Sequence, residues 1–571
     1  MRFILPIIAV IVLSGSAFTQ ETLYSQTSEV HDLMENYRAD WGSLSRFYFV
    51  DGSPERNERM QKFLQGYQEA LHQINFDAIS QNGKVDYLLF DNLLKRELNQ
   101  WNREAKDYQI VAAYFQHLEG IYELEVKRRR GYALEGEKVA KQLNEITTKN
   151  QVYWQDLSSF PLLNHTQLKL AKRTIQGYQE ALKSVFDFYN GYDPLFTWWV
   201  PEPYQQLISL LEDLAVKIES RANTDLVPKD DGSGIIGNPI GREAIIEELQ
   251  FAMIPYTPEE LIEIAHQEFA WCEKEMLQAS KELGFGNNWK AALELVKELH
   301  VPEGKQPEAM LELYHQSIAF LKEHDLITIP PLAEETWRMR MMSAEQQKVS
   351  PFFLGGEVFQ IAYPLPEMSH EEKMMSMRGN NPHFSRATVH HELIAGHHLQ
   401  QFMNRRHKAY RFFRTPFWTE GWALYWEMIL WDMNFPRDAK DKVGMLFWRM
   451  HRCARIIFSL NYHTLKWTPQ ECIDFLVDKV GHERANAEGE VRRSFTGGYG
   501  PLYQLAYMLG ALQFYALKEE LVDNGSMQLK DFHDAVMREN AMPVEMVRAL
   551  LSNQAITENY NSNWRFYKGL D

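Results

Sequence analysis

The sequence has 571 residues, of which 45% are hydrophobic and 13% aromatic, so the chain can bury a large core and is not disordered. Lys and Arg number 60 against 77 Asp and Glu, which gives a net charge of -17. This balance excludes nucleic acid as the main partner, because neutralising phosphates requires a basic surface. Three cysteines, none of them in a CxxC pair, exclude both a disulfide framework and a thiolate metal site.

Residues 1–20 are predicted to be a signal peptide for export. Arg2 supplies the positive charge, residues 3–13 form an apolar run, and small residues follow at 14–17. The run is shorter than the roughly 20 residues that a spanning helix needs, and no later stretch is long and apolar enough. We therefore expect a periplasmic or secreted protein without a membrane span, whose oligomeric state the sequence does not determine.

Most of the remaining chain has the apolar periodicity of helices. Two capping boxes with proline at the first helical position, Thr257–Glu260 and Thr468–Glu471, predict helix starts. The Gly- and Pro-containing stretch 227–241 is interpreted as a linker or loop between an N-terminal helical half, 21–226, and a C-terminal catalytic half, 242–571. Its GxGxxG match is not expected to bind a dinucleotide, because no strand precedes it and no helix opens after it.

A second kind of local structure is predicted at residues 352–363. The segment is rich in aromatic and β-branched residues and ends at Pro364, which favours β structure. Gly355 and Gly356 lie within it and indicate a turn or bulge between two short strands.

The strongest chemical motif places four histidines around one glutamate within residues 390–398. Imidazole and carboxylate groups bind a metal such as zinc, and a neighbouring Glu can activate a metal-bound water. The usual HExxH spacing is absent, because position 395 is Ala. In a regular helix, His391 and His398 would lie about 10 Å apart along the axis, and His397 would face another side. A distortion near Gly396 would bring His397 to His391, so we favour that pair and keep His398 as the alternative ligand.

A catalytic zinc site needs a third protein ligand. Glu420 begins the segment 419–427, whose aromatic character is too high for a surface helix, and a buried carboxylate there needs a partner. Glu427 shares its face seven residues later. Glu427 is interpreted either as the residue that orients a histidine ligand or as an exposed helix charge.

Four segments carry a resemblance to a known family: HHELIAGHHLQ (390–400), TEGWALYWE (419–427), CARIIFSLNYHTLKWTPQECIDFLV (453–477) and DFHDAVMRENAMP (531–543). They resemble the bacterial DUF885 family, which is grouped with gluzincin-like zinc metallopeptidases. Its architecture is similar to the mostly helical, deep-cleft peptidases such as angiotensin-converting enzyme, thimet-type oligopeptidases and carboxypeptidase Taq. The resemblance spans roughly 240–571 and extends more loosely into the N-terminal half.

The resemblance implies roles for individual residues. The HExxPGH pattern of the family falls on His391, Glu392, Gly396 and His397, and its further motifs imply Glu420 as third ligand and place His463 and Tyr507 in the site. Two departures are present. Ala395 replaces the proline of the family pattern, and residues 500–504 replace its PGQA segment, which should face the cleft.

The resulting expectation is a single large, mostly α-helical zinc metallopeptidase that hydrolyses short peptides. Glu392 would be the general base, and Tyr507 or Tyr499, together with His463, would stabilise the oxyanion. By the resemblance, the strand near 352–363 would present an edge to an extended peptide. Two alternatives remain: a zinc amidase or esterase, and a peptide-binding protein without turnover, against which the presence of Glu392 speaks.

Overall fold

The computed structural model describes residues 28–223, 229–349 and 352–570. Within these ranges the chain is mostly helical, with a single small sheet, so the predicted mostly α fold class is confirmed. The predicted signal peptide, 1–20, lies outside the described residues. None of the helices in these ranges combines the length and the apolar character that crossing a bilayer requires.

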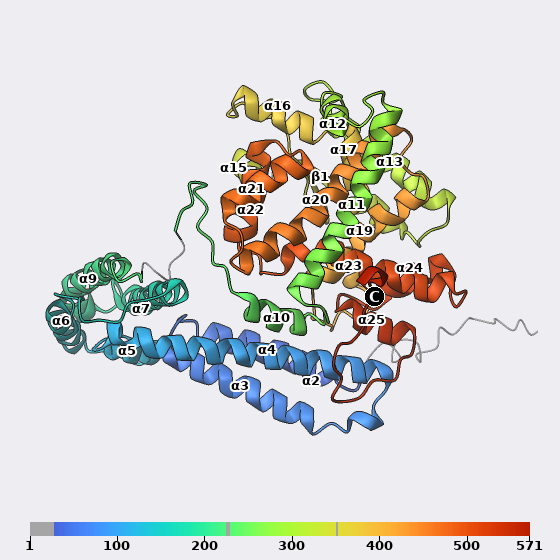
Figure 1. Ribbon diagram of the computed structural model, residues 1–571. Coiled ribbons are helices and arrows are strands. Elements are labelled where there is room, and N and C mark those ends of the chain that lie inside the picture. Colours follow the sequence, from blue (N-terminus) through green and yellow to red (C-terminus); the bar gives the residue numbers. More distant parts are fainter. Residues whose placement is uncertain (1–27, 224–228, 350–351, 571) are drawn as a thin grey trace, which may run out of the picture.

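The helices α2–α9 form the lower and left parts of the molecule in Figure 1, where the long helix α4 runs across the lower part. They are α2 (His31–Phe47), α3 (Pro54–His72), α4 (Gln81–Val111), α5 (Glu119–Arg129), α6 (Gly136–Tyr153), α7 (His165–Tyr189), α8 (Pro194–Trp199) and α9 (Pro201–Glu219).

The C-terminal half is a larger helical body, which rises above α4 in Figure 1. Its helices are α10 (Arg242–Phe251), α11 (Pro258–Glu282), α12 (Trp289–Lys297), α13 (Gln306–Glu323), α14 (Pro331–Thr336), α15 (Ala344–Val349), α16 (His370–Gly379), α17 (Pro382–Glu392), α18 (His397–Asn404), α19 (Pro416–Asp432), α20 (Ala439–His463), α21 (Pro469–Phe475), α22 (Arg484–Thr496), α23 (Tyr503–Lys518), α24 (Leu529–Arg538) and α25 (Val544–Leu551).

Both predicted capping boxes are present and set the starts of α11 and α21. The Thr257 hydroxyl accepts from the backbone N–H of Glu260, and the Glu260 carboxylate accepts from the N–H of Thr257. Thr468 and Glu471 make the same reciprocal pair before α21. These caps satisfy N–H groups that the first helical turn leaves without a partner.

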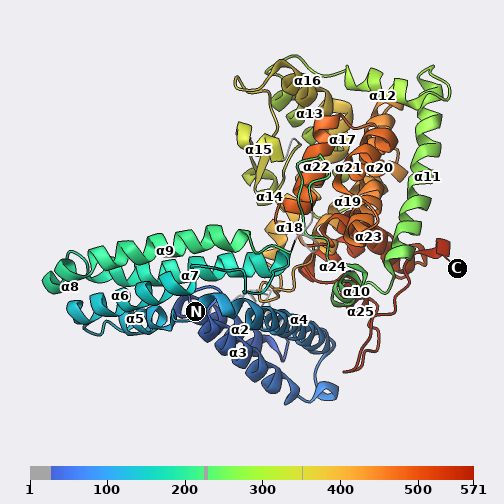
Figure 2. The same cartoon turned by 60° about the vertical axis from the view of Figure 1, so that its left-hand side comes forward.

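The hydrophobic cores divide the chain differently from the predicted halves. One core joins α2, α3 and the first part of α4 to the whole C-terminal body, and a second core lies among α5, α6, α7 and α9. The long helix α4 contributes to both, because Val85–Leu94 pack in the first core and Val111 packs in the second. In Figure 2, α5–α9 accordingly project away from the rest of the molecule.

The predicted linker is described from residue 229 onward and has no regular secondary structure up to Gly241. It is held against the C-terminal body. Asp231 accepts from the backbone N–H of Gln470 at 2.6 Å, and the N–H of Gly241 donates to the carbonyl of His463 at 2.9 Å. This segment therefore belongs structurally to the C-terminal body.

The small sheet contains β1 (Arg338–Met341) and β2 (Val358–Ile361), paired in parallel with Arg338 opposite Val358. The predicted strand segment therefore supplies β2, but its main partner comes from upstream and not from the same segment. The expected turn is present on the other edge, where Gln360 exchanges two backbone hydrogen bonds with Leu354. The edge of β2 that was expected to take a peptide is thus occupied at Gln360 by the chain itself.

Four helices, α17, α19, α20 and α23, pack against one another at the centre of the C-terminal body. The crossing of α19 with α23 is made by two glycines. A Cβ atom at Gly421 would lie 2.5 Å from the carbonyl carbon of Gly510, and a Cβ at Gly510 would overlap the carbonyl oxygen of Phe417. The two backbones therefore touch directly, one residue after Glu420.

Candidate metal centre

The helix that carries the histidine motif is broken where the sequence requires it. α17 ends at Glu392 and α18 begins at His397, with Leu393–Gly396 between them. The N–H of Gly396 donates to the carbonyl of His390 at 2.9 Å, and a Cβ atom at Gly396 would overlap the carbonyl oxygen of His391. Glycine is therefore needed here for close backbone approach. Trp422 secures the break by donating its indole N–H to the carbonyl of Ala395 at 3.0 Å.

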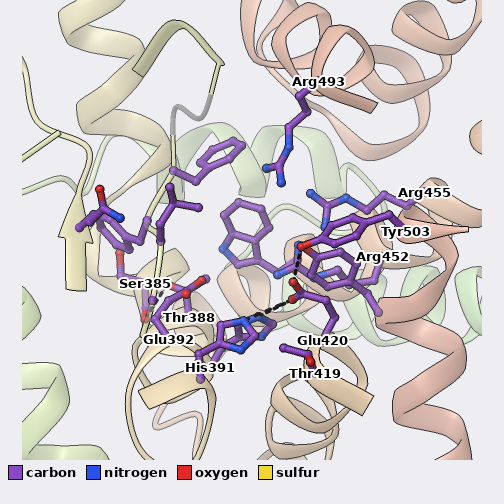
Figure 3. A pocket seen from close by; sticks show the side chains of 18 of the residues that line it. Ser385, Thr388, His391, Glu392, Thr419, Glu420, Arg452, Arg455, Arg493 and Tyr503 are labelled. Carbon is purple, nitrogen blue, oxygen red and sulfur yellow. Dashed lines mark hydrogen bonds and ion pairs between the residues drawn. The ribbon is translucent and has the colours of Figure 1, made fainter. Parts of the chain in front are cut away.

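This break brings the ring centres of His391 and His397 to 4.8 Å from each other. Helix α19 adds Glu420, which Figure 3 shows beside His391. The Oε2 atom of Glu420 lies 3.6 Å from Nε2 of His391 and 3.3 Å from Nε2 of His397. Burial opposes ionisation of Glu420, but the two histidines outweigh it and hold its pKa well below the usual range. Two imidazole nitrogens and one carboxylate oxygen thus converge on a single point.

The outer nitrogen of each histidine is hydrogen-bonded, which fixes the direction of the inner one. Nδ1 of His391 donates to Glu427 at 2.6 Å, so Glu427 is buried and orients a histidine. Nδ1 of His397 donates to the side-chain oxygen of Gln400 at 3.0 Å, and Gln400 is itself fixed by the carbonyl of Thr419. With Nδ1 of each ring held by these partners, Nε2 is the atom that faces Glu420 and that would bind a metal once it has lost its proton.

Glu392 lies beside this group without pairing to it. Its carboxylate oxygen lies within 4.8 Å of the histidine nitrogens, and its side chain lines the same cavity. Burial raises the pKa of Glu392 above its ordinary value, and the nearby histidines only partly offset this effect. Both carboxylates therefore lie near the two histidines: Glu420 is within ion-pair distance of both Nε2 atoms, and Glu392 lies within 4.8 Å of a ring nitrogen of each.

The other two histidines of the motif point elsewhere. His398 donates from Nε2 to the carbonyl of Ala333 at 2.7 Å, on the far side of α18. His390 packs edge-on against Phe435, and burial lowers its pKa to about 3. Neither residue is among those that line the cavity, so the structure places His397, not His398, next to His391.

Three tyrosines from α23 and the residues before it complete one wall. Tyr503 donates its hydroxyl to Oε1 of Glu420 at 2.5 Å, a contact that sequence analysis missed. The ring of Tyr507 lies 6.3 Å from that of His391 and nearly parallel to it, and burial raises the pKa of Tyr507 to about 12. Tyr499 also lines the cavity and accepts a hydrogen bond from Arg493 at 3.1 Å. Tyr503 lies one helical turn before Tyr507, and that spacing was the available signal.

His463 does not join the site. It is the last residue of α20, packs against Phe495, and is not among the residues that line the cavity. Arg455 lies on the same helix and does line the cavity, but His463 is eight residues further on, about 12 Å along the axis. The expected role of His463 in oxyanion stabilisation is therefore not supported by its position.

The cavity has a volume of about 330 Å³ and contains three arginines that the sequence analysis did not select. Arg452 and Arg455 come from α20, and Arg493 comes from α22. Figure 3 shows all three above and beside Glu420, on the side away from Glu392. Two cations, Arg452 and Arg455, within the long and largely apolar stretch of α20 were a signal that could have identified that pair.

A second group of potential ligands, His383, Asp438 and Asp441, lies elsewhere in the described residues. Here Asp441 is already paired, since Arg437 and Arg386 contact its carboxylate at 2.8 and 3.2 Å. His383 also bonds to it at 2.8 Å. A carboxylate shared by two guanidinium groups is a poor cation ligand, so the centre at His391, His397 and Glu420 is the better candidate.

Comparison with known proteins places this site in a family context. The family model described as "Bacterial protein of unknown function (DUF885)" matches residues 41–551. The chain belongs to the DUF885 family. The match covers the N-terminal helices as well as the site, so the helices around the second core are part of the family fold.

Two solved structures share the fold of this DUF885 chain. A proposed lipoprotein of unknown function from Shewanella oneidensis has a TM-score of 0.67 at 18% identity, covering 92% of this chain and 100% of that one. A proposed lipoprotein from Colwellia psychrerythraea has a TM-score of 0.56 at 17% identity, covering 88% and 91%. No curated protein matches the sequence. At these identities the likeness concerns the fold.

Proposed function

We propose that this DUF885 protein is an exported zinc-dependent metallopeptidase. The observation that carries the proposal is the convergence of His391, His397 and Glu420, with Glu420 Oε2 3.6 and 3.3 Å from the two Nε2 atoms. Two histidines and one glutamate are a known ligand set of hydrolytic zinc sites, which keep a further position open. The export signal predicted at residues 1–20 supports a location outside the cytoplasm, as do the similar structures named as proposed lipoproteins.

The residues fit zinc in donor type and in orientation. Imidazole and carboxylate groups are its ordinary ligands, and the outer nitrogens of both histidines are held by Glu427 and Gln400. When bound, zinc would polarise the substrate carbonyl and lower the pKa of a water molecule.

The remaining steps fall to the side chains around the ligands. Glu392 accepts a proton from the attacking water as the water oxygen bonds to the carbonyl carbon of the substrate. It then passes that proton to the leaving amine nitrogen as the C–N bond breaks. Its buried position and raised pKa suit a group that must carry a proton between two steps. Tyr507 is the candidate donor to the developing oxyanion, with Tyr499 as the alternative. Tyr503 is tied to Glu420 and positions that ligand.

Two other functions use the same residues. A zinc amidase or esterase would need the same base and ligands, whereas a peptide-binding protein without turnover would not need Glu392. The depth at which Glu392 is buried, beside both histidines, favours a hydrolase over a binding protein, because an unpaired buried carboxylate is costly.

The test is cleavage of a mixed library of short peptides, read by mass spectrometry, with an ester and a small amide included. We expect peptide cleavage that stops with a chelator and returns with zinc. The Glu392→Gln variant is the matched control, because it keeps the side-chain volume and removes the base. Cleavage of the ester or small amide alone would assign the alternative hydrolase, and zinc binding without any cleavage would assign the binding protein.

A further inference from the structure

Three buried arginines share the cavity with the proposed zinc site and do not belong to it. The side chains of Arg452, Arg455 and Arg493 are 6%, 3% and 8% exposed, so each cation is removed from bulk water. They enter from α20 and α22, whereas the ligands come from α17, α18 and α19. In Figure 3 their guanidinium groups face the same space as Glu420 and Tyr503. Buried cations of this kind require compensation by negative charge.

The protein supplies only part of that compensation. Glu490 accepts from Nε of Arg455 at 2.7 Å but lies 3.9 Å from Arg493. Arg452 is 3.7 Å from Glu427, whose close partner is His391. Within the described residues, Nε of Arg452, Nη1 of Arg455 and Nε of Arg493 are buried donors without a hydrogen-bond partner. One close ion pair therefore serves three guanidinium groups.

Aromatic rings hold the guanidinium groups in place. The central carbons of Arg452 and Arg455 lie 4.8 and 4.4 Å from the ring centre of Tyr507, and that of Arg493 lies 5.0 Å from the ring of Tyr499. Such contacts orient a guanidinium and leave its N–H donors free at the edge. A planar, bidentate anion matches this arrangement, and a carboxylate is the planar anion that a peptide carries.

The acidic residues that line the cavity indicate which end of a peptide could bind there. Among its described lining residues, Glu392 and Glu420 are the only acids, and both belong to the proposed metal centre. No carboxylate is left there to receive the ammonium group of a peptide N-terminus. The cavity of about 330 Å³ is at the lower end for ligand sites, which suits a short peptide segment.

We propose that Arg452, Arg455 and Arg493 form a subsite for the C-terminal carboxylate of the substrate, so that the enzyme releases short pieces from peptide C-termini. This inference rests on the proposed peptidase function for the cleavage step, but the carboxylate binding can be tested without it. Of the three arginines, Arg493 has the longest ion-pair distance, 3.9 Å to Glu490, and Figure 3 shows it reaching into the cavity from above, so it is the residue to change first.

The test compares two peptides of one neutral sequence, one with a free C-terminal carboxylate and the other with a C-terminal amide. Their affinities for the full-length Glu392→Gln protein, which should not turn them over, are measured by calorimetry. We expect the amide to bind roughly 10- to 100-fold more weakly, as for the loss of charge-assisted hydrogen bonds. A third peptide, amidated but ending in Glu, distinguishes a terminal carboxylate from one on a side chain and should bind like the amide.

The matched variants are Arg493→Gln and Arg492→Gln on the same helix. Arg492 is exposed and binds the carbonyl of Gly234, so its change should leave the acid-to-amide ratio intact. Arg493→Gln should reduce the ratio to near one, and Arg493→Lys should restore it only in part, because lysine lacks the planar fork. If circular dichroism shows that Arg493→Gln is unfolded, the acid–amide comparison on the protein that keeps all three arginines still tests the proposed subsite.

The outcomes separate the two proposals. Equal affinity for acid and amide, or no measurable binding of the acid, overturns the carboxylate subsite. Tight binding of the amide that ends in Glu makes it a side-chain subsite and overturns the C-terminal assignment. Acid-selective binding, with no cleavage by the wild-type enzyme, sinks the peptidase function and leaves the subsite standing. Cleavage of the acid and the amide peptide at equal rates supports the peptidase function and overturns the carboxylate subsite.

Discussion

Glu427 accepts a hydrogen bond of 2.6 Å from Nδ1 of His391, across the packed interface between α19 and α17. The same helix carries Glu420, seven residues earlier, whose carboxylate faces Nε2 of that histidine. One helix therefore both faces the imidazole and fixes its tautomer. Burial would raise the pKa of Glu427, but its bond to His391 and the charge of Arg452 lower it.

The Glu427→Gln change should weaken zinc binding without abolishing it. The amide oxygen can still accept from Nδ1, but it lacks the charge that raises the basicity of the ring. Loss of such outer contacts typically reduces metal affinity by roughly 10- to 100-fold. Competition with a chelator of known affinity measures the change. Unaltered affinity would mean that Glu427 serves only packing.

Purified wild-type protein should contain about one zinc per chain, since the proposed site offers three ligands and an open position. The variants His391→Ala and Glu420→Ala should each lose the metal while retaining helical circular dichroism. Elemental analysis after dialysis measures the stoichiometry. Full zinc content in both variants would show that the assigned ligands are wrong.

The two adjacent histidines should differ sharply. His397→Ala should lose zinc, because its Nε2 lies 3.3 Å from Glu420. His398→Ala should keep zinc and instead lose about 1–3 kcal/mol of stability, since the buried carbonyl of Ala333 loses its donor. Paired metal analysis and denaturant unfolding test this contrast, and the reverse pattern would contradict the placement of the helix break.

Glu392→Gln should retain zinc and lower turnover by about 10²–10⁴-fold, the usual contribution of a general base. The substitution keeps the side-chain volume, so substrate affinity should change little. The rate on the best library peptide and the zinc content are measured on the same preparation. Unchanged turnover would remove Glu392 from the mechanism, and lost zinc would make it a ligand.

Acid stability should depend on Glu490, which is fully buried beside Arg455 and Arg493. Burial raises its pKa, but the two arginines outweigh this and lower it to about 2, below its ordinary value of 4.5. Its stabilising contribution is therefore complete above pH 4.5 and is lost as the pH falls from 4.5 towards 2. Glu490→Gln should cost on the order of 3 kcal/mol at neutral pH, because it leaves buried cations without a partner.

The corresponding measurement is the melting temperature of wild type and Glu490→Gln between pH 7 and pH 3. The difference between the two proteins should shrink as the pH falls below 4.5. A difference that stays constant over this range would show that Glu490 does not titrate as its surroundings imply.

The grouping of His391, His397 and Glu420 could be predicted from sequence, because these residues fall in two short motifs. The distance between His391 and His398 in a regular helix, and the glycine at 396, together indicated a break and its position. The capping residues Thr257 and Thr468 located helix starts for the same reason, since capping depends on neighbours within one turn.

Features that depend on long-range packing could not be predicted in this way. The partner of β2 lies about twenty residues upstream, and nothing in Arg338–Met341 marks it as a strand. Arg493 reaches the cavity from a helix about 100 residues after the histidine motif, so only the fold brings it there. The prediction for His463 was based on its position in a sequence motif, which does not determine its position in space. His463 lies at the end of α20, too far along the helix to reach the cavity.

The contact between Gly421 and Gly510 bears on how the site can change over evolutionary time. Most helix pairs adjust to mutation by repacking side chains, and their axes shift as residues of different size are exchanged. Gly421 and Gly510 have no side chains to exchange, so at this point backbone atoms set the separation of α19 and α23. A substitution elsewhere in the core should therefore change the spacing of Glu420 and Tyr503, one on each helix, very little.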